Sequence, residues 1–245
     1  MNDWLKAGKL AADAREYAVD ICKAGKTYTE VVDQTEDYII KRGGFPAFPM
    51  DISVNHVAAH YCPYIEDDNV LEKGDVVKLD IGVHINGAVA DNAITVELGT
   101  NKYRELILAS KDACLAACEM AVPGCEIGKI GRVIEETITS AGFNSITNLS
   151  GHGVDMWTVH TEPTIPNYDN GNPKKLVEGQ HIAIEPFATD GVGAIKEGKP
   201  CGVYGFLQKK PVRLDSARNL MAQIEKDYKT LPFTERWLKD VKNVK

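Results

Sequence analysis

Residues 76–98, VVKLDIGVHINGAVADNAITVEL, carry the pattern that decides the fold. Apolar and β-branched residues lie on both sides of a short Ile85-Asn86-Gly87 turn, which predicts a β-hairpin. Each strand carries one aspartate, Asp80 or Asp91. A hairpin brings two such carboxylates to one place, where like charges are costly unless one is protonated or a cation lies between them.

Two downstream segments each offer one further metal ligand, His152 between two glycines and Glu185 before Pro186. With Asp80 and Asp91 they form an oxygen-rich set with one imidazole, which suits Mn²⁺, Fe²⁺, Co²⁺ or Zn²⁺. Two such ions about 3.5–4 Å apart lower the pKa of a water molecule and polarise a carbonyl. The four residues therefore predict a dinuclear metal site and hydrolytic chemistry.

Each residue also has a simpler explanation when taken alone. An aspartate at a strand end is usually a turn or capping residue, and His152 could be a loop histidine bonded to the backbone. Glu185 is less ordinary, because it follows the apolar run 182–184, where an unpaired carboxylate is expensive to bury.

The rest of the chain alternates helical and extended patterns. Apolar periodicity and glycine stops predict helices over 3–24, 27–42, 103–120, 127–141 and from 216 through Tyr228, with a further helical stretch beginning at 236–238. Period-2 patterns predict strands over 76–80, 88–97, within 145–164 and 179–188, and over 203–212, whereas 45–63 is expected to be loop-rich. This order, helices then acid-bearing strands and again helices then strands, suits a pseudo-twofold α/β fold with the site at the junction.

Composition sets broad limits. The chain has 245 residues, compatible with one large α/β domain, and its net charge of −7 argues against nucleic-acid binding as the main role. The N-terminus has no apolar stretch typical of a signal peptide, and no uncharged apolar run reaches about 18 residues, so no membrane span is expected. The six cysteines lack paired spacing and are expected to be buried free thiols rather than a disulfide or zinc knuckle.

Four segments carry a resemblance to a known family: VNHVAAHY (54–61), KLDIGVHINGAVADNAITV (78–96), LSGHGVDMWTVH (149–160) and AIEPFA (183–188). In this order they resemble the methionine aminopeptidases of peptidase family M24. ARNLMAQIEKDYKTLPFTERWL (217–238) is similar to the helical insertion that marks the type II, archaeal and eukaryotic branch. The resemblance covers the chain nearly end to end.

The resemblance implies a pita-bread α/β fold and the removal of the initiator methionine from new proteins, with a small uncharged second residue preferred. It implies that Asp80 holds one ion, that Asp91 bridges both, and that His152 and Glu185 bind the other. The glutamate matching Glu185 also handles the proton of the nucleophilic water. The cofactors are then two divalent ions, Co, Mn, Fe or Zn.

The same resemblance implies substrate-contact roles for His60 and His160. Neutral imidazoles there could hydrogen-bond the substrate carbonyl or the leaving amine, although a loop histidine without a family match would be read as exposed to solvent. Phe48 and Val159 match positions that line the methionine pocket, and an apolar pocket suits a thioether side chain. His56 and His84 match no functional position and are expected at the surface or in the hairpin.

The chain departs from the family in one respect. The family uses a fifth ligand, a second bridging glutamate on a strand beyond the helical insertion. No counterpart is found, because Glu225 and Glu235 lie inside the insertion-like segment. We therefore expect residues 1–245 to be a single pita-bread catalytic domain that is incomplete at its C-terminus, with the insertion starting near 214–245. A fragment of a longer enzyme is favoured over a natural short form with weakened or absent activity, and the second ion should bind poorly.

Two other functions stay open on the sequence. A prolidase-like Xaa-Pro peptidase shares the fold and ligand types, and a metal-poor inactive scaffold would follow from the missing glutamate. The expected partners of the favoured function are nascent polypeptide N-termini and the ribosome, with no nucleic acid and no membrane. We expect a cytoplasmic monomer.

Overall fold

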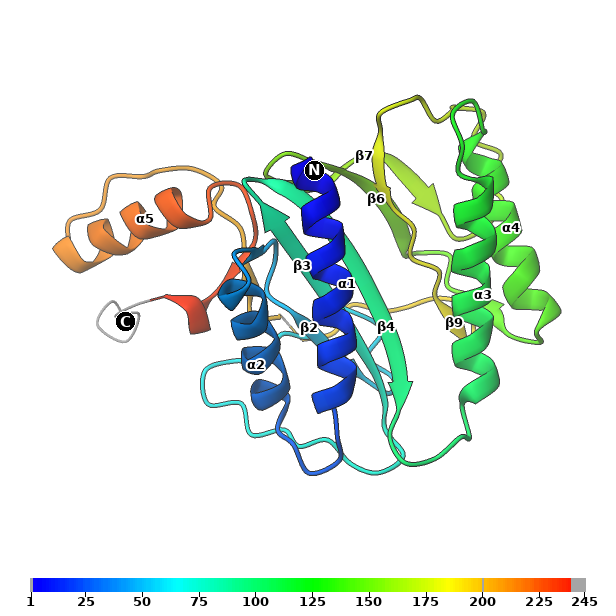
Figure 1. The fold of residues 1–245 in the computed structure, drawn as a ribbon, viewed down its shortest axis with the longest axis horizontal. Coiled ribbons are helices and arrows are strands. Elements are labelled where there is room, and N and C mark those ends of the chain that lie inside the picture. The colour runs from blue at the N-terminus through cyan, green and yellow to red at the C-terminus, as the bar shows by residue number, and fades with distance from the viewer. Residues whose placement is uncertain (1, 200, 239–245) are drawn as a thin grey trace.

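The computed structural model describes residues 2–199 and 201–238. Its elements follow one another as α1(Asp3–Ile21), α2(Tyr28–Lys41), β1(Phe45–Pro46), β2(Asp51–Val54), β3(Val76–Ile85), β4(Ala88–Glu97), α3(Arg104–Met120), α4(Ile127–Ser140), β5(Asn144–Ser145), β6(Ser150–Asp155), β7(Thr158–Pro166), β8(His181–Ala183), β9(Ala188–Thr189), β10(Val203–Tyr204), α5(Asp215–Asp227), β11(Phe233–Thr234) and a 3₁₀ turn, Glu235–Trp237. Figure 1 shows α1 and α2 over the β3–β4 hairpin, and α3 and α4 beside the β6–β7 pair.

The predicted hairpin is confirmed and is longer than expected. β3 pairs with β4 over its whole length, from Val76 opposite Glu97 to Ile85 opposite Ala88. Asn86 and Gly87 form a two-residue turn with φ of 52° and 95°, the positive values that a tight hairpin turn requires and that Gly and Asn adopt most readily.

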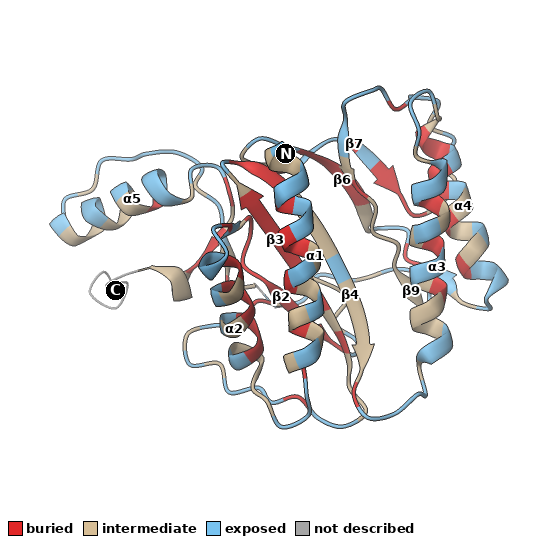
Figure 2. Cartoon of the chain, viewed as in Figure 1, coloured by how far each residue is buried: buried red, intermediate tan, exposed pale blue. Residues whose placement is uncertain are grey.

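Strict alternation along β3 separates a core face from a site face. Val77, Leu79, Ile81 and Val83 are each fully buried and belong to the cluster that α1 and α2 cover. Lys78, Asp80, Gly82 and His84 alternate with them and therefore point to the opposite face. The buried row in β3 and the inward faces of the helices are visible as red in Figure 2.

The expectation of a loop over 45–63 is wrong in part. β1 and β2 pair with successive stretches of β3, Phe45 opposite His84 and Asp51 opposite Asp80. The strand order across the site is therefore β2, β3, β4. β1 pairs with the same edge of β3 as β2 does, further along the strand. The four residues of β2 are all buried. Asp51 and Ser53 alternate with Ile52 and Val54, but four residues are too few for a clear strand pattern, and the proline-rich flank obscured it.

The second half repeats the layout with a smaller sheet. β6 pairs with β7 on one side and with β8 on the other. Helix α4 buries its apolar stripe, Ile127, Ile130, Ile134 and Ile138, each of them fully buried. Burying each isoleucine contributes about 1.5–3 kcal/mol relative to exposure, so this stripe anchors the half.

The two hairpins meet at their tips. Trp157, in the turn between β6 and β7, donates its backbone N–H to the carbonyl of Gly87 at 2.8 Å. Its indole covers Gly87 so closely that an added Cβ would lie 2.2 Å from Nε1, and its ring centroid lies 4.9 Å from that of His84. The pseudo-equivalent turns of the two halves are therefore in direct contact.

The C-terminal elements confirm one expectation and correct two. The helix expected from 216 through Tyr228 is confirmed as α5, whose C-cap is Tyr228. Only Val203 and Tyr204 of the predicted 203–212 strand form a strand, which is paired with β11. The stretch at 236–238 is the 3₁₀ turn, Glu235–Trp237, rather than the start of an α-helix. Residues 239–245, the end of the expected insertion, lie outside the described residues.

Within the part of the chain that the structure covers, none of the helices has the length and apolar character needed to cross a membrane.

Candidate metal centre

Asp80 and Asp91 lie on one face of the hairpin, as predicted. Asp91 stands directly opposite Gly82, and Gly82 is two residues beyond Asp80, on the same side of β3. The two carboxylates are therefore diagonal neighbours on adjacent strands. They are close enough to share a hydrogen bond between their side chains.

His152 and Glu185 come from the second half and reach the same place. His152 pairs with Ala183 across β6 and β8, and Glu185 follows two residues after Ala183. His152 Nε2 lies 3.0 Å from Glu185 Oε1 and 3.5 Å from Asp91 Oδ2. The junction of the two halves therefore brings Asp91, His152 and Glu185 into contact, with Asp80 beside Asp91.

The other ring nitrogen of His152 is held by the backbone. Nδ1 lies 3.0 Å from the carbonyl oxygen of Gly153, and a ring N–H donated to that carbonyl leaves Nε2 facing the carboxylates. A histidine held in this way is typical of metal ligands, because the second hydrogen bond fixes the orientation of the ring.

Negative charge accumulates in the site. Burial, followed by the nearby carboxylates of Asp91, Asp51 and Glu185, holds the pKa of Asp80 well above its usual range. Burial and then Glu185 raise the pKa of Asp91 to about 7. Burial alone disfavours charged His152, but the hydrogen bonds to Glu185 and to Gly153 leave its pKa above the usual value. A cation at this place would stabilise the ionised carboxylates.

The donor set fits a divalent metal ion. Asp80 Oδ1 is a buried carboxylate oxygen without a hydrogen-bond partner in the structure, and such an oxygen is costly unless a donor or a cation satisfies it. Over residues 2–199 and 201–238, no three His, Cys, Asp or Glu side chains already surround one point as a formed metal site does. The carboxylates instead contact His152 and each other.

Asp51 is a site-face residue that the sequence reasoning did not single out. It stands opposite Asp80 across β2 and β3, is only 5% exposed, and its Oδ1 has no hydrogen-bond partner in the structure. Burial, then the charges of Asp91 and Glu36, raise the pKa of Asp51 to about 8. The sequence signal for Asp51 was weak: an acid directly before the short segment Ile52-Ser53-Val54.

His160 lies beside the predicted ligand His152, and His60 is a neighbour of His160; both are exposed. The ring of His160 is edge-on to that of His152, with centroids 4.2 Å apart. The surrounding protein and the charge of His152 lower the pKa of His160, and His60 is close enough to lower it further. A lowered pKa favours the neutral imidazole that the predicted substrate contact requires.

Phe48 and Val159 belong to one apolar cluster next to the site. They are 8% and 5% exposed, and Ala183 and Leu231 complete the contact between the halves. The ring of Phe48 covers Gly82, where an added Cβ would lie 2.2 Å from the ring. Phe48 therefore lies beside the strand position that faces Asp91, as a residue of a substrate pocket there would.

The expectation for His84 is met, and that for the cysteines is met in part. His84 lies in the hairpin, where it is 5% exposed and its Nδ1 accepts the N–H of Gly87. Burial, followed by the charge of Lys229, lowers the pKa of His84 to about 4. All six cysteines are free, as expected, but only Cys22 and Cys62 are buried; Cys118 is exposed and the other three are partly exposed.

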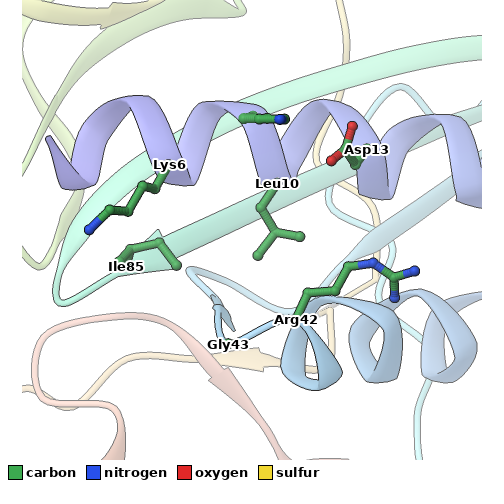
Figure 3. A pocket seen from close by; sticks show the side chains of 7 residues that line it. Lys6, Leu10, Asp13, Arg42, Gly43 and Ile85 are labelled. Carbon is green, nitrogen blue, oxygen red and sulfur yellow. The ribbon is translucent and has the colours of Figure 1, made fainter. Parts of the chain in front are cut away.

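A surface hollow of about 450 Å³ lies away from these residues (Figure 3). Lys6, Leu10 and Asp13 of α1 line it together with Arg42 at the end of α2 and Ile85 of β3. None of the candidate ligands or substrate residues contributes to it, so the hollow is separate from the metal centre.

The chain belongs to metallopeptidase family M24, whose pattern matches residues 3–228. A family of this kind depends on divalent metal ions, in agreement with the donor set.

Its sequence relatives include two archaeal methionine aminopeptidases. The one from Pyrococcus horikoshii is 45% identical over 235 residues, 96% of this chain and 79% of the relative. The one from Methanothermobacter thermautotrophicus is 43% identical over 242 residues, 98% of this chain and 81% of the relative.

Solved structures show the pita-bread fold of the same family. Methionine aminopeptidase from Rickettsia prowazekii superposes with a TM-score of 0.72 at 26% identity, over 96% of this chain and 87% of that chain. Prolidase from Pyrococcus furiosus superposes with a TM-score of 0.65 at 29% identity, over 75% of this chain and 54% of that chain. The predicted fold class is therefore confirmed.

Proposed function

We propose that this chain is a methionyl aminopeptidase that removes the N-terminal initiator methionine from newly made proteins, with a small uncharged second residue preferred. The observation that carries the proposal is the meeting of Asp91, His152 and Glu185 at the junction of the halves. Identities of 43–45% to methionine aminopeptidases over nearly the whole chain support it.

The metal ligands in this proposal are Asp80, Asp91, His152 and Glu185. Two divalent ions, Co, Mn, Fe or Zn, would be held there, Asp80 binding one, Asp91 both, and His152 with Glu185 the other. Bound ions supply a water molecule of lowered pKa and polarise the scissile carbonyl.

The remaining steps belong to the protein's own side chains. Glu185 takes the proton of the attacking water and passes it to the leaving amine. His60 and His160 hydrogen-bond the substrate carbonyl and the leaving amine as the tetrahedral intermediate forms. Phe48 and Val159 bury the methionine side chain, which orients the first peptide bond toward Glu185.

The substrates in this proposal are the N-termini of nascent polypeptides, which implies encounter with the ribosome in the cytoplasm. We propose a monomer that acts without a nucleic-acid or membrane partner. We propose that the chain folds as one catalytic domain and that the type II helical insertion begins near residue 214.

Cleavage of Met-Ala-Ser in the presence of Mn²⁺ or Co²⁺ tests the proposal. Wild type should release methionine, and Asp91→Ala should abolish the metal-dependent reaction while the protein stays folded. Full activity of Asp91→Ala would exclude this assignment of the metal centre.

The two other functions predict different results. A prolidase-like enzyme would cleave an Xaa-Pro dipeptide in preference to Met-Ala-Ser. An inactive scaffold would bind no metal despite intact ligands, which elemental analysis of the purified protein after addition of Mn²⁺ would reveal.

A further inference from the structure

Arg236 is a buried cation that has no part in the proposed chemistry. Its side chain is only 8% exposed, although it comes from the 3₁₀ turn that follows β11. The guanidinium contacts α2 of the first half, 200 residues earlier in the chain. A buried guanidinium is retained only where its donors are satisfied, so its partners indicate what it holds.

Glu36 is the main partner of Arg236. Nη2 of Arg236 lies 3.1 Å from Glu36 Oε1 and Nη1 lies 3.3 Å from Glu36 Oε2, a two-pronged pair with fixed geometry. Trp237 Nε1 adds a third bond to Glu36, at 2.8 Å, and Asp33 also accepts from Nη1. Glu36 is 5% exposed, so both members of the pair are buried.

The pair extends to two backbone segments that carry substrate residues. Glu36 Oε1 accepts the N–H of Met50 at 3.1 Å, two residues after Phe48. Arg236 Nε donates to the carbonyl of Pro63 at 3.1 Å, three residues after His60. One guanidinium therefore ties together the segments that present Phe48 and His60.

The segment around His60 needs such support. His60 has a φ of 64°, the left-handed region that a non-glycine side chain adopts only when its surroundings impose it. The carbonyl of Tyr61 accepts the N–H of Ile52 at 2.7 Å, which links this segment to β2. The bond to Pro63 fixes its far end.

We propose that Arg236 is a positioning residue for substrate, acting through Glu36 on Phe48 and through the Pro63 carbonyl on His60. It touches none of the four proposed metal ligands. Substrate affinity should therefore depend on Arg236, whereas metal affinity should not. This inference rests on the proposed aminopeptidase function.

Two variants separate positioning from stability. R236K keeps the charge but loses the two-pronged geometry and the bond to Pro63. E36Q/R236M removes both charges, so that neither is left buried and alone, and the carboxamide oxygen that replaces the Glu36 carboxylate can still accept from Met50. R132K is the matched control, because Arg132 pairs with Asp169 on the exposed surface of the second half.

Steady-state cleavage of Met-Ala-Ser and calorimetric titration with Mn²⁺ are measured on folded protein. R236K and E36Q/R236M should raise KM about tenfold, with kcat within about threefold and the Mn²⁺ Kd unchanged, and R132K should match wild type. An unchanged KM in both Arg236 variants would overturn the proposal, as would a loss confined to kcat or to Mn²⁺ affinity.

Hydrogen exchange keeps the test independent of the assigned activity. If wild type cleaves no methionyl peptide, the proposed function fails, but positioning still predicts faster amide exchange over residues 46–63 in R236K than in wild type or R132K. Equal exchange over that range would overturn the positioning role itself.

Discussion

The two halves place site residues in different ways. The first half offers Asp80 and Asp91 from two ten-residue strands paired without a break in register. The second half offers His152 from a strand whose pairing with β7 shifts register on both sides of Gly153, and Glu185 from beyond the end of β8. Regular pairing of β3 with β4 fixes the positions of Asp80 and Asp91, whereas the irregular strand β6 turns His152 toward them.

Exposure differs between one carboxylate of each half. The side chain of Asp91 is 14% exposed and that of Glu185 is 32% exposed. A carboxylate that must exchange protons with water and a leaving group needs solvent access, and a carboxylate that only binds a cation does not. This difference supports the proposal that Glu185, rather than Asp91, handles the proton.

The largest expected effect distinguishes these two roles. Glu185→Gln should lower kcat for Met-Ala-Ser by about 10³-fold, because an amide cannot accept the proton, while Asp80 and Asp91 still recruit metal. Asp91→Asn should lose both metal and activity. Mn²⁺ titration alongside kinetics would contradict the division if Glu185→Gln lost metal as completely as Asp91→Asn.

The next effect tests the packing of the irregular strand. In Gly151→Ala the new Cβ would lie 2.3 Å from the carbonyl oxygen of Ala183, so the backbone must shift, at a cost of about 1–3 kcal/mol. In Gly82→Ala the new Cβ meets the ring of Phe48, so a side chain rather than the backbone must shift.

Thermal unfolding should therefore show the larger drop for Gly151→Ala, about 2–4 °C for each kcal/mol in a chain of this size. Gly82→Ala should instead raise KM, because Phe48 is displaced from the methionine pocket. Equal melting temperatures for the two variants would contradict the difference between the halves.

A pH effect of intermediate size follows from the buried acids of the first half. The pKa values of Asp91 and Asp51 are about 7 and about 8 in the folded protein, against about 3.9 in an unfolded chain. Because the folded values are raised, the stability from these groups is fully present below about pH 4 and is lost as pH rises through 7 and 8.

Metal-free protein should therefore melt at a lower temperature at pH 8.5 than at pH 5.5. Mn²⁺ should raise the melting temperature more at pH 8.5, because the ligands bind as deprotonated groups. Thermal scans at both pH values, with EDTA and with Mn²⁺, measure this difference. Equal stabilisation by Mn²⁺ at the two values would contradict it.

The smallest effect concerns Asp51. Asp51→Asn removes one buried charge beside Asp80, so metal-free protein at pH 8.5 should gain about 1 kcal/mol of stability. Its Mn²⁺ affinity should fall about tenfold, as expected when charge near a metal site is removed. Asp37→Asn is the control, since that acid is 64% exposed, and it should change neither quantity.

The four proposed ligands could be identified from the sequence because each lies in a local motif. A hairpin turn placed Asp80 and Asp91 together, and Glu185 was an acid next to an apolar run. The hairpin and the two-half layout agree with the structure, and local patterns suffice for both. The roles of the four ligands remain predictions.

The features that could not be predicted from the sequence depend on pairing between segments that lie far apart in the chain. β2 has only four residues, too few for its alternation to identify it, and Asp51 was missed with it. Nothing local relates Glu36 to Arg236, and nothing local shows that His84 packs against Trp157 of the other half. The 203–212 segment is apolar in places, but only Val203 and Tyr204 form a strand, because β11 pairs with them alone.

The tip contact between the two hairpins provides a natural optical probe. The Trp157 indole lies 3.5 Å below the ammonium group of Lys229 and next to His84, surroundings that perturb its emission. Any rearrangement that separates the two hairpins removes His84 from the ring. The contribution of Trp157 to the intrinsic fluorescence therefore reports the contact between the two halves without a label.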